Sequence, residues 1–199
     1  PEQMIELTPC TQLYVSIDAH SRETLKAIDR PLNEDFWERF IRSQELLANR
    51  KQRTVYRLTL VKGANMSEAI QGYAKLIRIG QPTFIEVKGV TFCGPDGGLT
   101  MTNVPYHEEV KLFCQQLCQQ LNEDYKNDNL STQYDLACEH AHSCCILISD
   151  TRMKKNNKWH TWIDYPKFQH LYRRWRDFGE EFTDEDYSCE TPDWASFGS

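Results

Sequence analysis

Three short segments of this chain place apolar and polar side chains at alternating positions along much of their length, and stretches with helical periodicity lie between them. The alternating segments cover residues 12–19, 54–61 and 84–90. A period of two is typical of a strand with one buried face. Strands that take turns with helices predict βαβ units and a parallel sheet. The sequence therefore predicts an α/β fold.

The polar faces of these strands distinguish between the possible α/β architectures. A strand covered by helices on both faces reads as nearly continuous apolar sequence. The polar positions here are Tyr14, Ser16 and Asp18, then Arg57 and Thr59, then Glu86 and Lys88. A partial (β/α) barrel, with helices outside and a polar cleft inside, satisfies this pattern, and its site would lie at the carboxyl ends of the strands. The candidate site residues are then Ser16, Asp18, Thr59, Lys62, Asn65, Glu86 and Lys88.

The remaining elements are readable from periodicity and breakers. Helices are expected over residues 33–49, 67–79, 105–121 and 166–178, and one strand-like stretch over 134–149. The Gly-rich segment 94–98 lacks a following Lys-Ser/Thr pair and is expected to be a loop rather than a phosphate cradle. The barrel part is expected to cover residues 1–182. Residues 183–199 lack periodicity and are expected to be an extended tail that packs through Trp194 and Phe197.

Cysteine spacing and hydropathy indicate in which cellular compartment the protein is expected. The chain holds eight cysteines at irregular spacings, which favours free thiols in a reducing compartment, the cytoplasm. The longest apolar run, residues 144–148, is far too short to span a bilayer, so no membrane is expected. Cys114 and Cys118 follow the apolar register of their helix, which favours a place in the core.

Charge is unevenly distributed along a chain of net charge −6. Residues 152–176 carry eight Lys and Arg and a single acid, Asp164, whereas residues 180–193 carry seven acids and no base. A shorter basic run extends from Arg50 to Lys62. Such runs are either solvated surface or a face that contacts phosphates.

Several polar side chains have both a structural and a chemical interpretation. Ser16 and Asp18 either hold the hydroxyls of a ribose or cap the loop after their strand. Arg57 either pairs with Glu86 on the next strand or binds an anion. Lys88 could form a Schiff base if burial lowers its pKa, although an ion pair with Glu86 would keep it charged.

The segment 138–145 has the residue types of a metal site. On one strand, Cys138, His140, His142 and Cys144 would share a face. Ligands two residues apart on a strand lie about 6–7 Å apart, so one strand alone cannot surround a zinc ion. Buried thiols beside histidines at the mouth of a cleft are the favoured interpretation, and no metal is expected.

Motifs along nearly the whole chain resemble one known family. They include residues 11–19, Asp29-Arg30-Pro31, residues 53–62 with Asn65-Met66, residues 84–91, Leu99-Thr100-Met101, residues 107–110, Glu139-His140, residues 159–164 and 191–195. Together they are similar to the radical S-adenosylmethionine enzymes that make the wybutosine base of tRNA. The resemblance places the chain in the C-terminal half of a partial radical-SAM barrel.

The resemblance also implies an activity for the full-length protein. The family converts N1-methylguanosine at position 37 of tRNA-Phe into 4-demethylwyosine, with pyruvate as carbon donor. Its cofactors are S-adenosylmethionine and a four-iron, four-sulfur cluster. Its partners are the anticodon stem-loop of tRNA-Phe, pyruvate, and an electron donor that is either a flavin domain or a flavodoxin-like protein.

This chain departs from the family in one large respect and one small one. The C-x3-C-x2-C cluster motif of the family lies upstream, so the fragment alone is expected neither to bind the cluster nor to turn over. Ala141 stands where the family commonly has Glu.

By position, the resemblance assigns cofactor contacts to Ser16, Asp18, Thr59 and Asn65. It places Glu86 and Lys88 at the reaction volume as the candidate catalytic pair. The charge pattern assigns RNA contacts to Arg57, Lys62, Lys154, Lys155, Lys158, Arg173, Arg174 and Arg176. Two alternatives stay open, a catalytically dead RNA-binding module and an aldolase-like barrel that uses Lys88.

Overall fold

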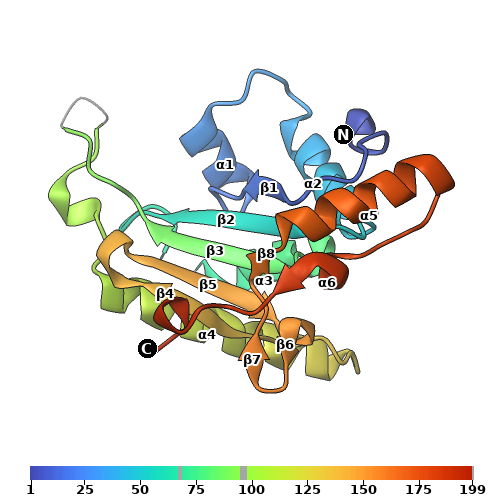
Figure 1. Ribbon diagram of the computed structural model, residues 1–199. Coiled ribbons are helices and arrows are strands. Elements are labelled where there is room, and N and C mark those ends of the chain that lie inside the picture. Colours follow the sequence, from blue (N-terminus) through green and yellow to red (C-terminus); the bar gives the residue numbers. More distant parts are fainter. Residues whose placement is uncertain (67–68, 95–97, 199) are drawn as a thin grey trace.

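The computed structural model describes residues 1–66, 69–94 and 98–198, and its centre is a mixed five-stranded sheet (Figure 1). The strands are β1 (Leu13–Ser16), β2 (Thr54–Leu60), β3 (Phe84–Gly89), β4 (Tyr134–His140) and β5 (Cys145–Asp150). Their order in the sheet is β1-β2-β3-β5-β4. Strands β1, β2 and β3 are parallel, whereas β5 runs antiparallel to β3 and β4 antiparallel to β5. The α/β class is confirmed.

The single strand expected over residues 134–149 is wrong, because the structure divides this stretch into a hairpin. Residues Ala141–Ser143 form a short 3-10 turn, and Cys144 follows in the left-handed region at a φ of 48°. A non-glycine residue rarely adopts this conformation, so the sequence carries no obvious turn signal here. The hairpin also explains why the sheet is mixed rather than parallel throughout.

The helices agree with the periodicity except at three places. They are α1 (Arg22–Asp29), α2 (Phe36–Leu47), α3 (Ile70–Gly80), α4 (His107–Asn127), α5 (Tyr165–Phe178) and α6 (Asp184–Tyr187). Helix α1 was not expected, and its N-terminus is capped by the Ser21 hydroxyl, which accepts from Thr24 N. Helix α4 continues two turns beyond its expected end, and α6 interrupts the expected extended tail. Residues 67–68, expected to begin the second helix, and 95–97 of the expected Gly-rich loop lie outside the described residues.

One face of the sheet packs against the helices and forms the main core. The inward side chains of β2, β3 and β5 are fully buried with those of α3 and α4, and α2 adds Leu47. They include Tyr56, Leu58 and Leu60 on β2 and Ile85 and Val87 on β3, each at 0% exposure. These are the apolar positions of the predicted alternation, so the inward faces of β2 and β3 are confirmed.

The C-terminal segment lies against part of the opposite face, in front of the sheet in Figure 1. Val55, Phe84 and Ala137 of the sheet pack there against Met153 and Trp159. Short strands complete the segment: β6 (Lys154–Lys155) pairs with β7 (Lys158–Trp159), and β8 (Trp162–Ile163) pairs with β9 (Ser188–Cys189). In the tail, Phe197 packs against the main core, whereas Trp194 is 68% exposed and meets the edge of Trp162.

A buried carboxylate fixes this segment to the sheet. Asp184 is 2% exposed, and its two oxygens accept from Nη1 and Nη2 of Arg152, each at 2.7 Å. The hydroxyl of Thr83, just before β3, donates to the same carboxylate at 2.6 Å. Both oxygens of this carboxylate accept from donors, one of them from a charged guanidinium N–H and a hydroxyl together, which offsets the cost of burying the charge. These contacts therefore hold the C-terminal segment beside the start of β3.

No helix in the described part of the chain is long and apolar enough to cross a bilayer.

Five buried tyrosines make the fold sensitive to alkali. Burial raises the pKa of Tyr125 to about 12 and raises those of Tyr56, Tyr73, Tyr134 and Tyr187 as well. Because the unfolded phenols ionise near their ordinary value of 10.0, the folded state holds these protons more tightly. Their contribution to stability is fully present below pH 10 and is lost as pH rises through the folded pKa values. We expect alkaline unfolding above about pH 10, with tyrosinate absorbance and loss of far-ultraviolet circular dichroism rising together. Ionisation of all phenols with retained secondary structure would contradict this.

Candidate functional site

The polar positions of the three parallel strands form two adjacent rows on one face of the sheet. Ser16 lies opposite Arg57, and Arg57 lies opposite Glu86. In the next row, Thr59 lies opposite Lys88. Ser16 and Arg57 are exposed, and the other three are half-buried. The structure therefore brings five of the seven predicted polar positions together in these rows, on the side of the sheet away from the main core.

Glu86 is the centre of the first row. Its Oε1 lies 3.5 Å from Nε of Arg57, and its Oε2 accepts a hydrogen bond of 3.1 Å from the hydroxyl of Tyr14. Burial, and then the charge of Glu86, raise the pKa of Tyr14 to about 12, so the phenol remains a donor near neutrality. The expected Arg57–Glu86 pair is thus present, with Tyr14 as a third member.

Lys88 faces a thiol across the sheet. Its register partner on β5 is Cys145. Burial raises the pKa of Cys145 to about 12, with a further contribution from the charge of Glu86. A protonated thiol is a weak nucleophile, so Cys145 is inert near neutral pH. Lys88 therefore stands beside a thiol that stays protonated near neutral pH.

Asn65 holds the carboxyl ends of β1 and β2 together. Its Nδ2 donates to the carbonyl oxygens of Asp18 and Thr59 at 3.0 and 2.8 Å, and its Oδ1 accepts from Val61 N at 2.7 Å. The residue is 1% exposed. Its amide is therefore already engaged, and Asn65 shapes the loop ends on which Asp18 and Thr59 stand.

Asp18, another of the predicted polar positions, follows β1 at the carboxyl ends of the strands and is half-buried. Burial, and then the nearby charge of Asp29, raise the pKa of its carboxyl above the ordinary value. In the described part of the chain no side-chain donor hydrogen-bonds to it. A ligand that donates hydrogen bonds to this carboxylate would offset the cost of its burial.

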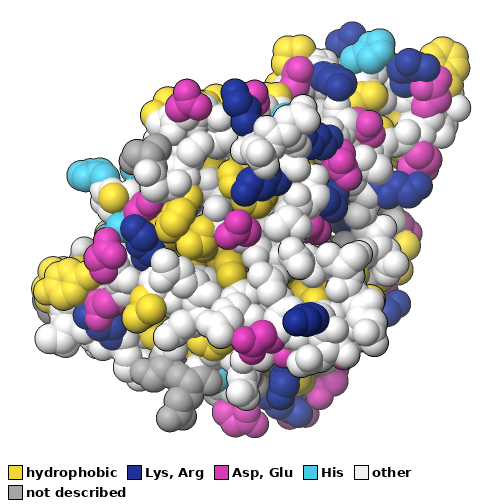
Figure 2. Space-filling view, turned by 90° about the horizontal axis from the view of Figure 1, so that it is seen from below, with side chains coloured by type: hydrophobic (Ala, Val, Ile, Leu, Met, Phe, Trp, Pro, Cys, Tyr) yellow, Lys and Arg dark blue, Asp and Glu magenta, His cyan; other side chains and the backbone are white. Residues whose placement is uncertain are grey.

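The basic stretch of residues 152–176 is largely neutralised by the acidic stretch that follows it. Lys155 lies 3.2 Å from Glu185, Arg174 lies 2.6 Å from Glu180, and Lys158 pairs with Glu190. Arg176 pairs with its neighbour Asp177 at 2.7 Å. Accordingly, Figure 2 shows Lys and Arg side chains interspersed with Asp and Glu. The two charge runs, which looked independent in sequence, face one another in the fold.

The other predicted RNA contacts have mixed surroundings. Nζ of Lys62 lies 2.6 Å from Glu109 and 4.7 Å from the centre of the Tyr106 ring. Lys154 lies over the ring of Trp159 at 5.0 Å. Among the described residues, Arg173 has no ion-pair partner within 4 Å. Lys154 and Arg173 are thus the predicted RNA contacts that have no ion-pair partner among the described residues, whereas Arg57 pairs with Glu86.

The four possible metal ligands of the hairpin do not share one strand. Cys138 and His140 belong to β4, His142 lies in the turn, and Cys144 precedes β5. Nδ1 of His140 instead contacts Ser143 Oγ at 2.6 Å. Among residues 1–66, 69–94 and 98–198, no three His, Cys, Asp or Glu side chains are grouped closely enough to hold a metal ion.

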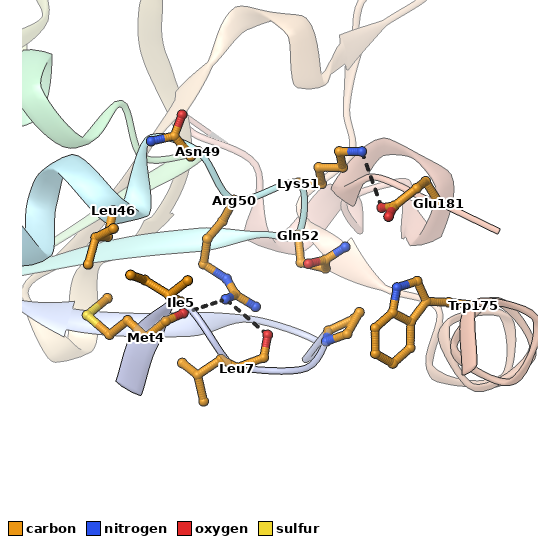
Figure 3. A pocket seen from close by; sticks show the side chains of 11 residues that line it. Met4, Ile5, Leu7, Leu46, Asn49, Arg50, Lys51, Gln52, Trp175 and Glu181 are labelled. Atoms are coloured by element: carbon orange, nitrogen blue, oxygen red, sulfur yellow. Dashed lines mark hydrogen bonds and ion pairs between the residues drawn. The ribbon is translucent and has the colours of Figure 1, made fainter. Parts of the chain in front are cut away.

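A hollow of about 310 Å³ lies at the amino end of β2, away from the carboxyl ends of the strands (Figure 3). Figure 3 shows Arg50 between the N-terminal segment and the start of β2, where it donates to the carbonyl oxygens of Met4 and Leu7, each at 3.5 Å. Lys51 reaches Glu181 at 3.2 Å. The cations at the start of the Arg50–Lys62 run therefore hold chain segments together.

Two site residues escaped the sequence reasoning. Tyr14 stood on the predicted polar face but was not nominated, although its hydroxyl is the second partner of Glu86. Cys145 joins the site only through the hairpin, which the sequence did not reveal. The alternation that marks Ser16 also marks Tyr14, so the signal for Tyr14 was present in the sequence.

Comparisons with known proteins agree with the resemblance. The family model for wyosine base formation matches residues 79–150. The whole chain is 50% identical to the S-adenosyl-L-methionine-dependent tRNA 4-demethylwyosine synthase of Danio rerio, 51% identical to that of Arabidopsis thaliana and 48% to that of Homo sapiens. It spans 26%, 29% and 26% of these relatives, about a quarter of their length.

Solved structures show the same relationship. A structure of TYW1 with a lysine-pyruvate adduct bound matches with a TM-score of 0.59 and 25% identity, over 78% of this chain and 46% of that one. A crystal structure of archaeal TYW1 shares the fold with a TM-score of 0.52. With half of its residues identical to those of its curated relatives along its whole length, the chain belongs to the family of S-adenosyl-L-methionine-dependent tRNA 4-demethylwyosine synthases.

Proposed function

We propose that this chain is one wall of the catalytic barrel of a tRNA 4-demethylwyosine synthase. The observation that carries the proposal is about 50% identity, over the whole chain, to enzymes of that name. The full-length protein would convert N1-methylguanosine-37 of tRNA-Phe into 4-demethylwyosine with pyruvate. Residues 1–182 would form the C-terminal half of a partial radical-SAM barrel, and residues 183–199 a tail that packs on it. The cytoplasm would be its compartment.

The described residues fit S-adenosylmethionine and do not fit an iron–sulfur cluster. A cluster needs three accessible thiolates, whereas burial raises the pKa of both Cys114 and Cys118 inside α4, and no other suitable group lies among the described residues. No side chain among the described residues donates a hydrogen bond to the half-buried Asp18, which suits the hydroxyls of a ribose. Ser16, Asp18 and Thr59 would hold the cofactor, Asn65 would set their loop ends, and the bound cofactor supplies the radical chemistry.

The side chains of this wall would position the reactants. Glu86 holds Arg57 and Tyr14 in fixed orientations, and all three lie on the open face of the sheet. An ordered guanidinium in this place suits a carboxylate or a phosphate. Lys88 brings a second cation to the next row. Together they would orient an anionic substrate and exclude water, which is the contribution of a preorganised wall.

RNA contacts would come from a smaller set of cations than the sequence indicated. Lys154 and Arg173 would contribute most readily, because neither has an acidic partner among the described residues. The other predicted contacts would contribute only after their ion pairs open, namely Arg57, Lys62, Lys155, Lys158, Arg174 and Arg176. The anticodon stem-loop of tRNA-Phe would be the ligand. An electron donor, either a flavin domain or a flavodoxin-like protein, would complete the system.

A second proposal assigns covalent chemistry with pyruvate to Lys88. A solved relative carries a lysine-pyruvate adduct, and Lys88 is half-buried beside the inert thiol of Cys145. The lysine amine would attack the keto carbon of pyruvate and lose water to give an imine, which borohydride reduces to a stable secondary amine. The alternative is a lysine elsewhere in the full-length protein.

Both proposals are tested in the full-length protein. Anaerobic incubation with S-adenosylmethionine, pyruvate and tRNA-Phe that carries N1-methylguanosine should yield 4-demethylwyosine in nucleoside mass spectrometry. The absence of product, while the relative from Schizosaccharomyces pombe forms it under the same conditions, would refute the first proposal. Borohydride with pyruvate should label the peptide of Lys88, and Lys88→Arg should abolish that label. Labelling confined to another lysine would refute the second.

A further inference from the structure

Arg53, just before β2, is a buried cation without an acceptor. The residue is 6% exposed, and burial lowers the pKa of its guanidinium. Its Nε and Nη1 are sealed from solvent and have no hydrogen-bond partner among the described residues. The guanidinium carbon lies over the Phe84 ring, 4.1 Å from its centre, and this cation–π contact stabilises the position of the guanidinium without satisfying its N–H donors by a conventional acceptor. A buried charge in this state is costly unless an anion reaches it.

The acids close to Arg53 along the fold are already engaged. Asp184 contributes to the field at Arg53, yet its two oxygens accept from Arg152 and Thr83. The backbone of Arg53 is engaged as well, since Arg53 N donates to the hydroxyl of Tyr187 at 3.0 Å and its carbonyl oxygen accepts from Leu13 N at 3.0 Å. Among the described residues, the guanidinium is thus held in place by packing but has no counter-ion.

A pocket of about 300 Å³ opens at Arg53, on the polar side of the sheet but at the amino ends of the strands. Its mouth is aromatic: Tyr14, Trp162 and Tyr165 line it and are 46%, 46% and 59% exposed. Gln12 also lines it, and its Oε1 is buried without a hydrogen-bond donor among the described residues. The pocket thus combines an unpaired cation, an unfilled acceptor and flat apolar surfaces.

We propose that this pocket is a nucleotide subsite, with the phosphate at Arg53 and the base against Trp162 and Tyr165. A guanidinium edge matches the geometry of phosphate oxygens. Aromatic side chains stack on any base, because every base has a π-face. The oxygen of Gln12 would accept from an N–H of the base. The nucleotide is either one residue of the RNA substrate, which rests on the proposed function, or a free mononucleotide, which does not.

Calorimetric titration of the full-length protein tests the site with three probes. These are guanosine monophosphate, guanosine and inorganic phosphate. The monophosphate should bind more tightly than either part alone. Arg53→Gln should weaken its binding about tenfold or more, because a charge-assisted contact is lost. Trp162→Ala should weaken binding of the monophosphate and of guanosine but leave that of phosphate unchanged. Lys51→Gln, which removes one charge two residues away, should bind as wild type does.

The two sources and the possible failures give different results. If Arg53→Gln also weakens tRNA binding and lowers the magnitude of its log–log salt slope by about 0.7–0.9, the nucleotide belongs to the RNA. If tRNA binding is unchanged while monophosphate binding falls, the site takes a free nucleotide. Should Arg53→Gln fail to fold, the Trp162→Ala titrations decide. Equal monophosphate affinity in wild type and both variants would overturn the subsite. Loss of product formation with the subsite intact would refute only the proposed function.

Discussion

Replacing Gly80 with alanine is expected to lower the free energy of unfolding by about 3 kcal/mol. Gly80 ends α3, and a Cβ built on it would lie 1.6 Å from the hydroxyl oxygen of Tyr56 and 2.7 Å from its ring carbon Cζ. Tyr56 is fully buried between β2 and the helices, so its ring has no free volume into which to move. Chemical denaturation followed by circular dichroism measures the change.

A double-mutant cycle separates this clash from a general effect of alanine. The hydroxyl of Tyr56 is buried and has no hydrogen-bond partner among the described residues, so Tyr56→Phe alone should be neutral or slightly stabilising. Combined with Gly80→Ala, it removes the atom nearest to the new methyl group. The double variant should therefore be more stable than Gly80→Ala by about 1 kcal/mol or more. Strict additivity would show that the hydroxyl is not the obstacle.

The polar rows of the site could be predicted because they depend on local alternation alone. A period of two in β1, β2 and β3 determines which side chains share a face, and parallel register then brings Ser16, Arg57 and Glu86 into line. The same alternation located the core positions of β2 and β3. Nothing about distant parts of the chain was needed for these conclusions.

The features that sequence reasoning missed depend on pairings between distant residues or on rare backbone angles. The hairpin at Cys144 turns through a left-handed φ at a residue that does not signal it. The acids that neutralise Lys155 and Lys158, Glu185 and Glu190, are far from them in sequence, and only the packing of the C-terminal segment brings these charges together. The burial of Arg53 likewise arises from Phe84 and from the C-terminal segment, since its own neighbours in sequence are polar.

Glu86→Gln in the full-length protein is the second substitution with a large expected effect. The carboxylate receives Arg57 and Tyr14, and the neutral amide keeps the shape but loses the charge that holds the guanidinium. We expect product formation to fall about 100-fold, because small misplacements of positioning groups cost rates of this order. Glu45→Gln on α2 is the matched control, since Glu45 is exposed and pairs only with Arg42 at 3.0 Å.

If the polar face of β1, β2 and β3 faces the reaction, the rate of product formation depends on the carboxylate of Glu86. The rate of 4-demethylwyosine formation is measured for wild type, Glu86→Gln and Glu45→Gln at saturating S-adenosylmethionine, pyruvate and tRNA, with equal iron content and equal circular dichroism. The rate is expected to fall about 100-fold in Glu86→Gln and to stay at the wild-type value in Glu45→Gln. Equal rates in all three proteins would contradict this expectation and would place the reaction on another surface of the fold.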